Sequence, residues 1–313
     1  MSEIVTFGET MIRLSPARAE RLETAESLDF RTAGAESNVA IAATRLGADA
    51  TWLSKLPDNA LGRRVRSDIR RHGVRPKIAW CDEGRQGTYY IEQGGQPRGA
   101  NVIYDRQGAA ITTAEPAELA THAIDAADVF FTTGITPALS DTLYETTAEL
   151  IETDTTTGFD LNYRSKLWSE ATAAAAYDEF LPAVDLLFVP ERDARSVLGI
   201  KGNAKSIAET LRSRYDCETV ILTRGQEGAL AATVSGVIEQ PAFNTETTDP
   251  IGTGDAFVGA YLSQYVRGAS TDRALEFGAA TAALKRTIQG DIAVVTEPEV
   301  DRVIEQSGDK IIR

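Results

Sequence analysis

Residues 247–257 read TTDPIGTGDAF, and no other eleven residues decide as much about the fold. Gly252 and Gly254 flank a threonine, and the aspartate at 255 precedes an apolar, helix-like run that reaches residue 266. Glycine lets the backbone turn tightly and leaves room for a ligand to approach it closely. The first amides of the following helix lack intrahelical partners, so they predict an anion-binding site at its N-terminus.

Asp255 stands on the rim of this expected anion site. A carboxylate in that position can take a proton from a hydroxyl group. An anion site beside a base is what phosphoryl transfer to an alcohol requires, because catalysis there consists mainly of positioning and charge stabilisation. The alternative interpretation is an ordinary helix start, in which Asp255 only complements the helix dipole.

The chain has 313 residues, which fits two average domains or one larger α/β domain. Its opening segment leads directly into a strand-like run at 4–7, without a basic region or a long apolar stretch. We therefore expect no signal peptide, no membrane contact and a cytoplasmic location. The two cysteines, Cys81 and Cys217, lie far apart and outside any CxxC motif, so we expect neither a disulfide framework nor a thiolate metal site.

The net charge of -14 argues against a nucleic-acid-binding protein, which needs a basic face. Arginines outnumber lysines by 25 to 7. An acid excess with few lysines favours a saline, haloarchaeal type of cytoplasm, where salt screens the repulsion between carboxylates. An ordinary acidic cytosolic protein remains the alternative. His72 and His122 lie in polar, helix-like segments, so we expect surface histidines and no histidine-based metal site.

Short apolar runs recur along the chain and are separated by helix-like segments. They lie at 4–7, 51–54, 129–132, 158–161, 186–189, 220–223 and 229–234. Strand and helix in alternation predict an α/β fold with a mostly parallel central sheet covered on both faces. Ligands of such sheets gather at the carboxyl ends of the strands.

Residues 78–112 break this alternation, because strand-like runs follow one another there without a helix between them. They lie at 78–80, 88–92 and 101–105, and similar runs occur at 12–14 and 28–30. We expect these five runs to form a small separate sheet. Such a sheet packs on something else, either as a lid over a cleft or against a second subunit. The prediction is one domain with an inserted lid, forming a dimer or a tetramer through the lid sheet.

Three further segments carry polar residues where ligands are expected. Residues 34–38 read GAESN before a helix-like run, and residues 159–164 read FDLNYR at the end of a strand. Arg164 suits bidentate binding of a carboxylate or phosphate, while Tyr89 and Tyr104 lie in the expected lid. Taken alone, the first segment is a sufficient helix cap and the tyrosines are ordinary edge-strand residues. Neither a GxGxxG fingerprint nor a complete P-loop occurs.

Together these segments resemble a carbohydrate kinase of the ribokinase (PfkB) family over the whole chain. Gly8-Glu9, the 34–38 segment and the 249–255 signature stand in the order and spacing of that family. Within the family, the chain is most similar to 2-keto-3-deoxygluconate kinases, through FDLNYR, LWS at 167–169, YDR at 104–106 and QGD at 289–291. The resemblance implies a single ribokinase-like three-layer sandwich over residues 1–313, with lid strands inserted at about 10–32 and 78–112.

The resemblance also implies ATP-dependent phosphorylation of the 6-hydroxyl of 2-keto-3-deoxygluconate, or of its C4 epimer 2-keto-3-deoxygalactonate. Asp255 would be the general base, and the amides of Gly252, Thr253 and Gly254 would stabilise charge on the transferred phosphoryl group. The residues expected to hold the acid sugar are Gly34, Asn38, Tyr89, Tyr104, Arg106, Ile135 and Arg164. Those expected near the nucleotide are Asn162, Thr223, Gly225, Gly228, Gly252 and Gly254.

The implied cofactors are ATP and Mg²⁺, with K⁺ as a candidate companion ion. Mg²⁺ would be carried largely by the phosphates. The family's metal-associated Asn-x-x-Glu reads PERD at 190–193, so only Asp193 is left for that role. Two other positions depart from the family pattern: Thr253 replaces the usual alanine of the glycine signature, and Pro250 replaces a threonine found in many members.

Three alternatives stay open at this level. A kinase of the same fold could act on a neutral sugar such as fructose or ribose, but it would not need Arg164, because a buried guanidinium without an anionic partner is costly. A catalytically silent sugar-binding protein is disfavoured by the intact Asp255 and its two glycines. A dinucleotide-dependent dehydrogenase lacks its glycine fingerprint here.

Overall fold

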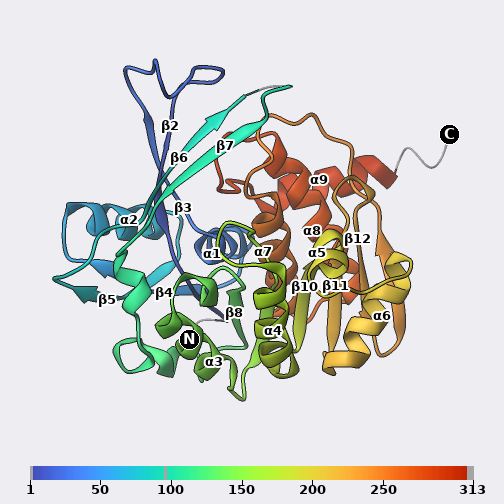
Figure 1. Ribbon diagram of the computed structural model, residues 1–313. Helices are drawn as coiled ribbons and strands as arrows, with labels where there is room; N and C mark the ends of the chain where they lie inside the picture. Colours follow the sequence, from blue (N-terminus) through green and yellow to red (C-terminus); the bar gives the residue numbers. More distant parts are fainter. Residues whose placement is uncertain (1–2, 95–96, 309–313) are drawn as a thin grey trace.

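A large, mostly parallel sheet forms the centre of the computed structural model, which describes residues 3–94 and 97–308 (Figure 1). Within those residues its strand order is β13-β12-β11-β10-β9-β8-β1-β4-β5. All neighbouring pairs from β11 to β5 are parallel, and β12 and β13 add an antiparallel hairpin at one edge. The strands are β1 (Ile4–Phe7), β4 (Ala50–Pro57), β5 (Arg75–Cys81), β8 (Val129–Thr133), β9 (Thr156–Asp160), β10 (Leu186–Pro190), β11 (Thr219–Thr223), β12 (Ala229–Thr233) and β13 (Gly236–Gln240).

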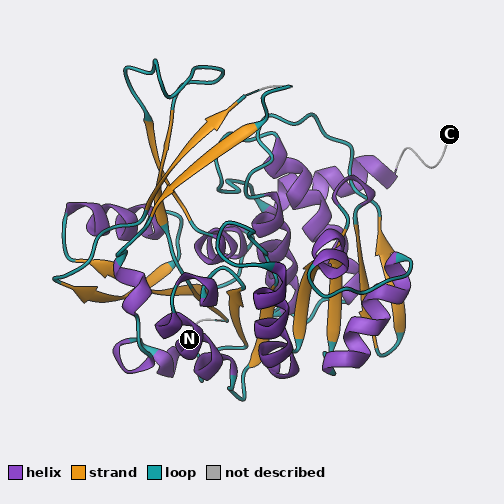
Figure 2. Cartoon of the chain, viewed as in Figure 1, coloured by secondary structure: helices purple, strands orange, loops and turns teal. Residues whose placement is uncertain are grey.

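Helices cover both faces of this sheet (Figure 2). One face carries α1 (Ala35–Arg45), α2 (Ala60–Arg70), α7 (Thr253–Tyr265) and α8 (Thr271–Arg286), and α9 (Glu297–Gly308) packs on α8. The other face carries α3 (Asp141–Ile151), α4 (Glu170–Phe180), α5 (Glu191–Ser196) and α6 (Ala204–Tyr215). Short 3-10 turns in the connections are η1 (Ala110–Thr113), η2 (Pro116–Glu118), η3 (Thr121–Ala123), η4 (Pro137–Leu139), η5 (Leu181–Ala183) and η6 (Gly225–Glu227).

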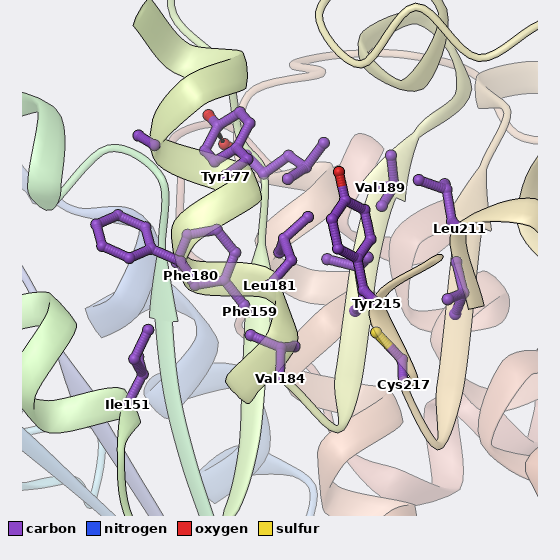
Figure 3. Close-up of a cluster of buried hydrophobic side chains, with 14 of the residues drawn as sticks. Ile151, Phe159, Tyr177, Phe180, Leu181, Val184, Val189, Leu211, Tyr215 and Cys217 are labelled. Carbon is purple, nitrogen blue, oxygen red and sulfur yellow. Dashed lines mark hydrogen bonds between the residues drawn. The ribbon is translucent and has the colours of Figure 1, made fainter. Parts of the chain in front are cut away.

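The apolar character of the strands follows from this coverage. Every residue of β4 and β8 is buried, because side chains pointing to either face meet a helix layer. On the α4 and α6 side, Phe159 of β9 packs against Tyr177 and Phe180 of α4, and Tyr215 of α6 lies in the same cluster (Figure 3). The prediction of an α/β three-layer sandwich with a mostly parallel central sheet is therefore confirmed.

A second, four-stranded sheet projects from the body beside β4 and β5 (Figure 1). Its strand order is β3-β2-β6-β7, and it consists of β2 (Met11–Ser15), β3 (Asp29–Ala33), β6 (Thr88–Gln93) and β7 (Ala100–Asp105). The lid strands expected at 12–14, 88–92 and 101–105 lie in this sheet, and the one expected at 28–30 corresponds to β3, which begins at Asp29. We call it the lid sheet.

The strand expected at 78–80 was assigned to the wrong sheet. It belongs to β5, which pairs in parallel with β4 at the edge of the main sheet, with Ser54 opposite Ile78. The reason is the helix that precedes it. Because α2 connects β4 to β5, these three elements form an ordinary parallel crossover, and the break in the strand–helix alternation begins only after residue 81. Among the described residues, no helix is both long and apolar enough to cross a membrane.

Candidate active site

A cavity of about 470 Å³ lies between the lid sheet and the carboxyl ends of the main-sheet strands. Thirteen of the residues expected from the sequence line it. They are Gly34, Asn38, Tyr89, Tyr104, Arg106, Ile135, Asn162, Arg164, Thr223, Gly252, Thr253, Gly254 and Asp255. The fold thus collects residues from β6, β7, α1, α7 and three strand ends around one space.

The glycine signature forms a turn that opens directly into α7. Gly252 caps the helix with a φ of 76°, a left-handed conformation that only glycine adopts easily. The Thr253 hydroxyl donates to the Pro250 carbonyl oxygen at 2.7 Å, so the side chain that replaces alanine is engaged within its own turn. Gly254 is exposed, and a side chain there would meet no protein atom within 4 Å. The helix N-terminus is therefore open to an anion.

Replacing Gly252 with Ala should destabilise the protein by more than the backbone strain of its positive φ alone. A Cβ at Gly252 would lie 1.9 Å from the Asp291 carbonyl oxygen, whereas Gly268 has a similar φ of 73° and open space around it. We expect Gly268→Ala to cost about 1–2 kcal/mol from backbone strain, and Gly252→Ala to lower the free energy of unfolding further. Urea unfolding of both variants measures the difference. Equal decreases in the free energy of unfolding would show that the backbone at Asp291 moves away from the new side chain at little cost.

Asp255 lies in the first turn of α7 and contacts α1, the helix that follows Gly34. The Asn38 side-chain amide donates to Asp255 Oδ2 at 2.7 Å. Burial raises the pKa of Asp255 to about 6, while the Asn38 hydrogen bond and the charge of Arg164 oppose that rise. A carboxylate with this pKa is ionised at neutral pH and is basic enough to share a proton with a hydroxyl group.

Two other buried carboxyl groups surround Asp255. Burial raises the pKa of Glu36 to about 7, opposed by hydrogen bonds from the Thr133 and Thr136 hydroxyls at 2.7 and 2.8 Å. Burial also raises the pKa of Asp160 to about 7, and the negative charge of Asp255 adds to this effect. The negative charge of Asp255 raises the pKa of both groups, so their protonation is linked to that of Asp255.

The pH dependence of the reaction should report this arrangement. Because Asp255 must be ionised to act as a base, kcat/KM should rise with pH through a pKa of about 6. In Asn38→Ala the hydrogen bond that favours the ionised form is lost, so this limb should move to higher pH. Measuring kcat/KM from about pH 5 to 8 tests the shift. If the rise of kcat/KM occurred at the same pH in Asn38→Ala, it would reflect the ionisation of a group other than Asp255.

Arg106 has a partner that the sequence reasoning missed. Its guanidinium lies 3.3 Å from Glu9 Oε2 and stacks 4.3 Å above the ring centroid of Tyr104. Glu9 is buried; burial raises its pKa, and Arg106 opposes the rise. Arg106 lines the cavity, so its expected contact with a substrate carboxylate stays a prediction, and Glu9 is an additional partner of its charge. The Gly8-Glu9 pair, directly after β1, is the sequence feature that could have indicated Glu9 as a residue of the site.

Arg164 is the cavity arginine without a carboxylate partner. Within the described chain it forms no ion pair, and its guanidinium donates to the carbonyl oxygens of Asn162 and Tyr163 at 3.2 and 3.0 Å. The side chain is exposed rather than buried. The burial cost invoked from the sequence therefore does not apply. The feature that distinguishes the site is a cavity guanidinium that forms no direct ion pair with a described carboxylate, although its charge favours the ionised forms of Asp255 and Asp160.

A second cavity of about 200 Å³ adjoins the first across the glycine turn. Thr223, Thr253 and Gly254 line both cavities. Gly225 and Gly228 line the second cavity, as expected for a nucleotide edge, and Phe243, Phe257 and five alanines make much of its wall apolar. An apolar slot beside an anion-binding turn fits a base attached to phosphates.

The sequence assigned Asp193 to a metal ion, but Asp193 lines neither cavity. It is buried, and Oδ1 accepts a hydrogen bond from Arg192 Nε at 2.8 Å. No group of three or more His, Cys, Asp or Glu side chains in the described chain forms a metal cage. Asp160 does line the first cavity. One carboxylate fits Mg²⁺ that arrives on substrate phosphates, because that ion needs few protein ligands.

The two cavities meet at the N-terminus of α7, an arrangement that suits the transfer of a phosphoryl group between two substrates. The chain belongs to the pfkB family of carbohydrate kinases, whose family model matches residues 1–298. It is 60% identical over 307 residues to the 2-dehydro-3-deoxygalactonokinase of Haloferax volcanii, covering 97% of this chain and 96% of that protein.

Solved structures agree with this assignment. The 2-dehydro-3-deoxygluconokinase of Thermotoga maritima is 31% identical, with a TM-score of 0.88 and coverage of 96% of this chain and 98% of that one. The E. coli protein described as a ribokinase II, solved in complex with ATP and Mg²⁺, has a TM-score of 0.88 at 18% identity. It covers 98% of this chain and 100% of that one, and it supports the fold alone.

Proposed function

We propose that this carbohydrate kinase transfers the γ-phosphoryl group of ATP to the 6-hydroxyl of 2-dehydro-3-deoxy sugar acids. These are the 2-keto-3-deoxy acids named above. The observation that carries the proposal is Arg164, an unpaired guanidinium on the wall of the acceptor cavity. A carboxylate substrate would pair with it, whereas a neutral sugar would leave it without a partner.

The preferred epimer in this proposal is 2-dehydro-3-deoxygalactonate, with 2-dehydro-3-deoxygluconate as the second substrate. The support is the 60% identity to a kinase that carries the galactonate name. The two acids differ only in the orientation of one hydroxyl, and a site that hydrogen-bonds that hydroxyl can separate them by its geometry.

The proposed chemistry assigns a role to each group around the glycine turn. Asp255 takes the proton of the 6-hydroxyl as its oxygen forms a bond to the γ-phosphorus, and the bond from that phosphorus to the β–γ bridging oxygen breaks to release ADP. Asn38 holds the carboxylate of Asp255 in place. The amides at the start of α7 face the charge that develops on the transferred group. Mg²⁺ would neutralise phosphate charge if it bound with the nucleotide, and Asp160, which lines the first cavity, would be its protein ligand in this proposal.

Release of ADP, measured with MgATP in high potassium chloride, tests the proposal directly. The acceptors are the two 2-dehydro-3-deoxy acids, fructose, ribose and none. We expect turnover with both acids, a higher kcat/KM for the galactonate epimer, and none with the neutral sugars. Turnover with fructose or ribose alone would keep the kinase and reject the carboxylate pocket. Silence from folded protein with every acceptor would reject catalysis on these sugars.

A further inference from the structure

Lys285, in the last turn of α8, has no contact with solvent. Its ammonium group donates to two backbone carbonyl oxygens, those of Asp249 and Ile288, each at 3.2 Å. Burying an ammonium group is costly unless it is paired and hydrogen-bonded. A lysine held this way, directly behind the glycine turn, calls for a reason beyond helix packing.

The charges around Lys285 balance within the buried cluster. Arg13 of the lid sheet lies 3.6 Å from the Asp249 carboxylate and forms a short ion pair with Asp291. Asp249, Asp291, Arg13 and Lys285 together carry two negative and two positive charges, all on side chains that are almost fully buried. Burial lowers the pKa of Lys285, whereas the charges of Asp249, Asp291 and Asp255 oppose this and Arg13 adds to it.

This cluster supports the phosphate-binding turn from behind. The Asp249 carboxylate accepts from the amides of Ile251 and Gly290 at 3.1 and 3.0 Å. Gly252 packs so closely on the Asp291 carbonyl group that no side chain fits between them. Lys285 links the segment that leads into the glycine turn to the segment that follows α8, because it donates to the carbonyl oxygens of Asp249 and Ile288.

Backbone carbonyl oxygens can replace the hydration shell of K⁺. Here these carbonyl oxygens already accept hydrogen bonds from an ammonium group of the chain itself. K⁺ at this place would displace Lys285 and add a positive charge to a balanced buried cluster. The residues present therefore do not fit a bound K⁺, although K⁺ was a candidate ion from the sequence.

We propose that the ammonium group of Lys285 is a built-in monovalent cation that holds residues 249–254 in their phosphate-binding shape. The enzyme then works without a bound monovalent metal ion, and salt acts on it only through ionic strength. Lys285 is a positioning residue, because it reaches the reacting groups through the turn that it supports.

Exchanging the salt of the wild-type protein is the first test. Activity and the thermal unfolding midpoint are measured in chlorides of potassium, sodium and tetramethylammonium at equal ionic strength, with MgATP constant. We expect similar values in all three, because no site is left for a specific cation to stabilise the folded state. A K⁺-specific gain that saturates with concentration would overturn the proposal. The activity arm rests on the proposed substrate, while the unfolding arm does not.

Lys285→Met provides the second test, with Lys201→Met as the control at an exposed lysine remote from the turn. Loss of the ammonium group should misplace the turn and lower kcat on the order of 10²-fold, the cost expected for a displacement of about 1 Å. Ammonium or potassium chloride should restore part of the activity and raise the unfolding midpoint, whereas tetramethylammonium, which is too large, should do neither.

A Lys285→Met protein that folds but responds to no cation would show that Lys285 only fills space, and would contradict the proposal. If that variant does not fold in any salt, the exchange of cations on the wild-type protein decides the question alone. Lys201→Met should behave as the wild-type protein in every salt.

Discussion

Asp255→Asn should lower kcat about 10²–10⁴-fold, the contribution typical of a general base, with little change in the KM for the sugar. The amide has nearly the same shape and can still contact Asn38, but it has no ionised oxygen to accept the hydroxyl proton. The remaining rate would come from the anion-binding amides of α7. Steady-state kinetics with both substrates varied separates the loss in kcat from any change in binding.

A matched control exists at the start of the next helix. Asp272 lies in the first turn of α8, as Asp255 does in α7, and it is exposed and outside the cavity. Asp272→Asn removes only an interaction with the helix dipole, worth about 0.3–1 kcal/mol of stability, and should leave kcat unchanged. If both variants kept nearly full activity, Asp255 would be a dipole partner and the proton acceptor would have to be another group.

Arg164→Leu should cost about 2–4 kcal/mol of transition-state binding with a 2-dehydro-3-deoxy acid, since it removes a charge-assisted pair with the substrate carboxylate. That range corresponds to roughly a 30- to 900-fold loss in kcat/KM. The lower end is expected, because Arg164 is exposed and solvent screens its charge. Because the charge of Arg164 also lowers the pKa of Asp255, the comparison is made at a pH well above that pKa, where the effect should be confined to acid substrates and should appear in kcat/KM.

Lys166→Gln is the control for this variant. Lys166 is two residues from Arg164 and exposed, and its ammonium group donates to the Val102 carbonyl oxygen rather than lining the cavity. The Lys166→Gln variant removes a positive charge from the same segment and should lower kcat/KM only slightly. Equal losses in Arg164→Leu with an acid substrate and with fructose would overturn the carboxylate assignment, because the neutral sugar makes no such pair.

Much of the fold and most of the cavity wall are encoded locally. The strand at 4–7 and its parallel neighbours could be predicted because a strand buried on both faces requires a short, unbroken apolar run. The glycine signature could be predicted because Gly252 needs a positive φ and the helix after it leaves free amides. Each of these features depends on a few consecutive residues, which a sequence displays directly.

The errors and omissions have a common physical origin. The strand at 78–80 joins the main sheet through α2, and this depends on which strand it pairs with rather than on its own composition. Arg106 contacts Glu9, 97 positions earlier in the chain, and no local pattern indicates this partner. The exposure of Arg164 depends on the shape of the whole cavity, which no local pattern records.

The sequence by itself determined the class of fold and the glycine turn that opens α7, and it predicts Asp255 as the base, because local geometry and residue chemistry suffice for these. Tertiary structure alone decided the electrostatics of the site. Asn38 meets Asp255 across 217 positions of sequence, and Arg13 meets Asp291 across 278. The pKa of a carboxyl group and the need for a bound cation depend on burial and on charges within a few ångströms, and only folding brings those charges together.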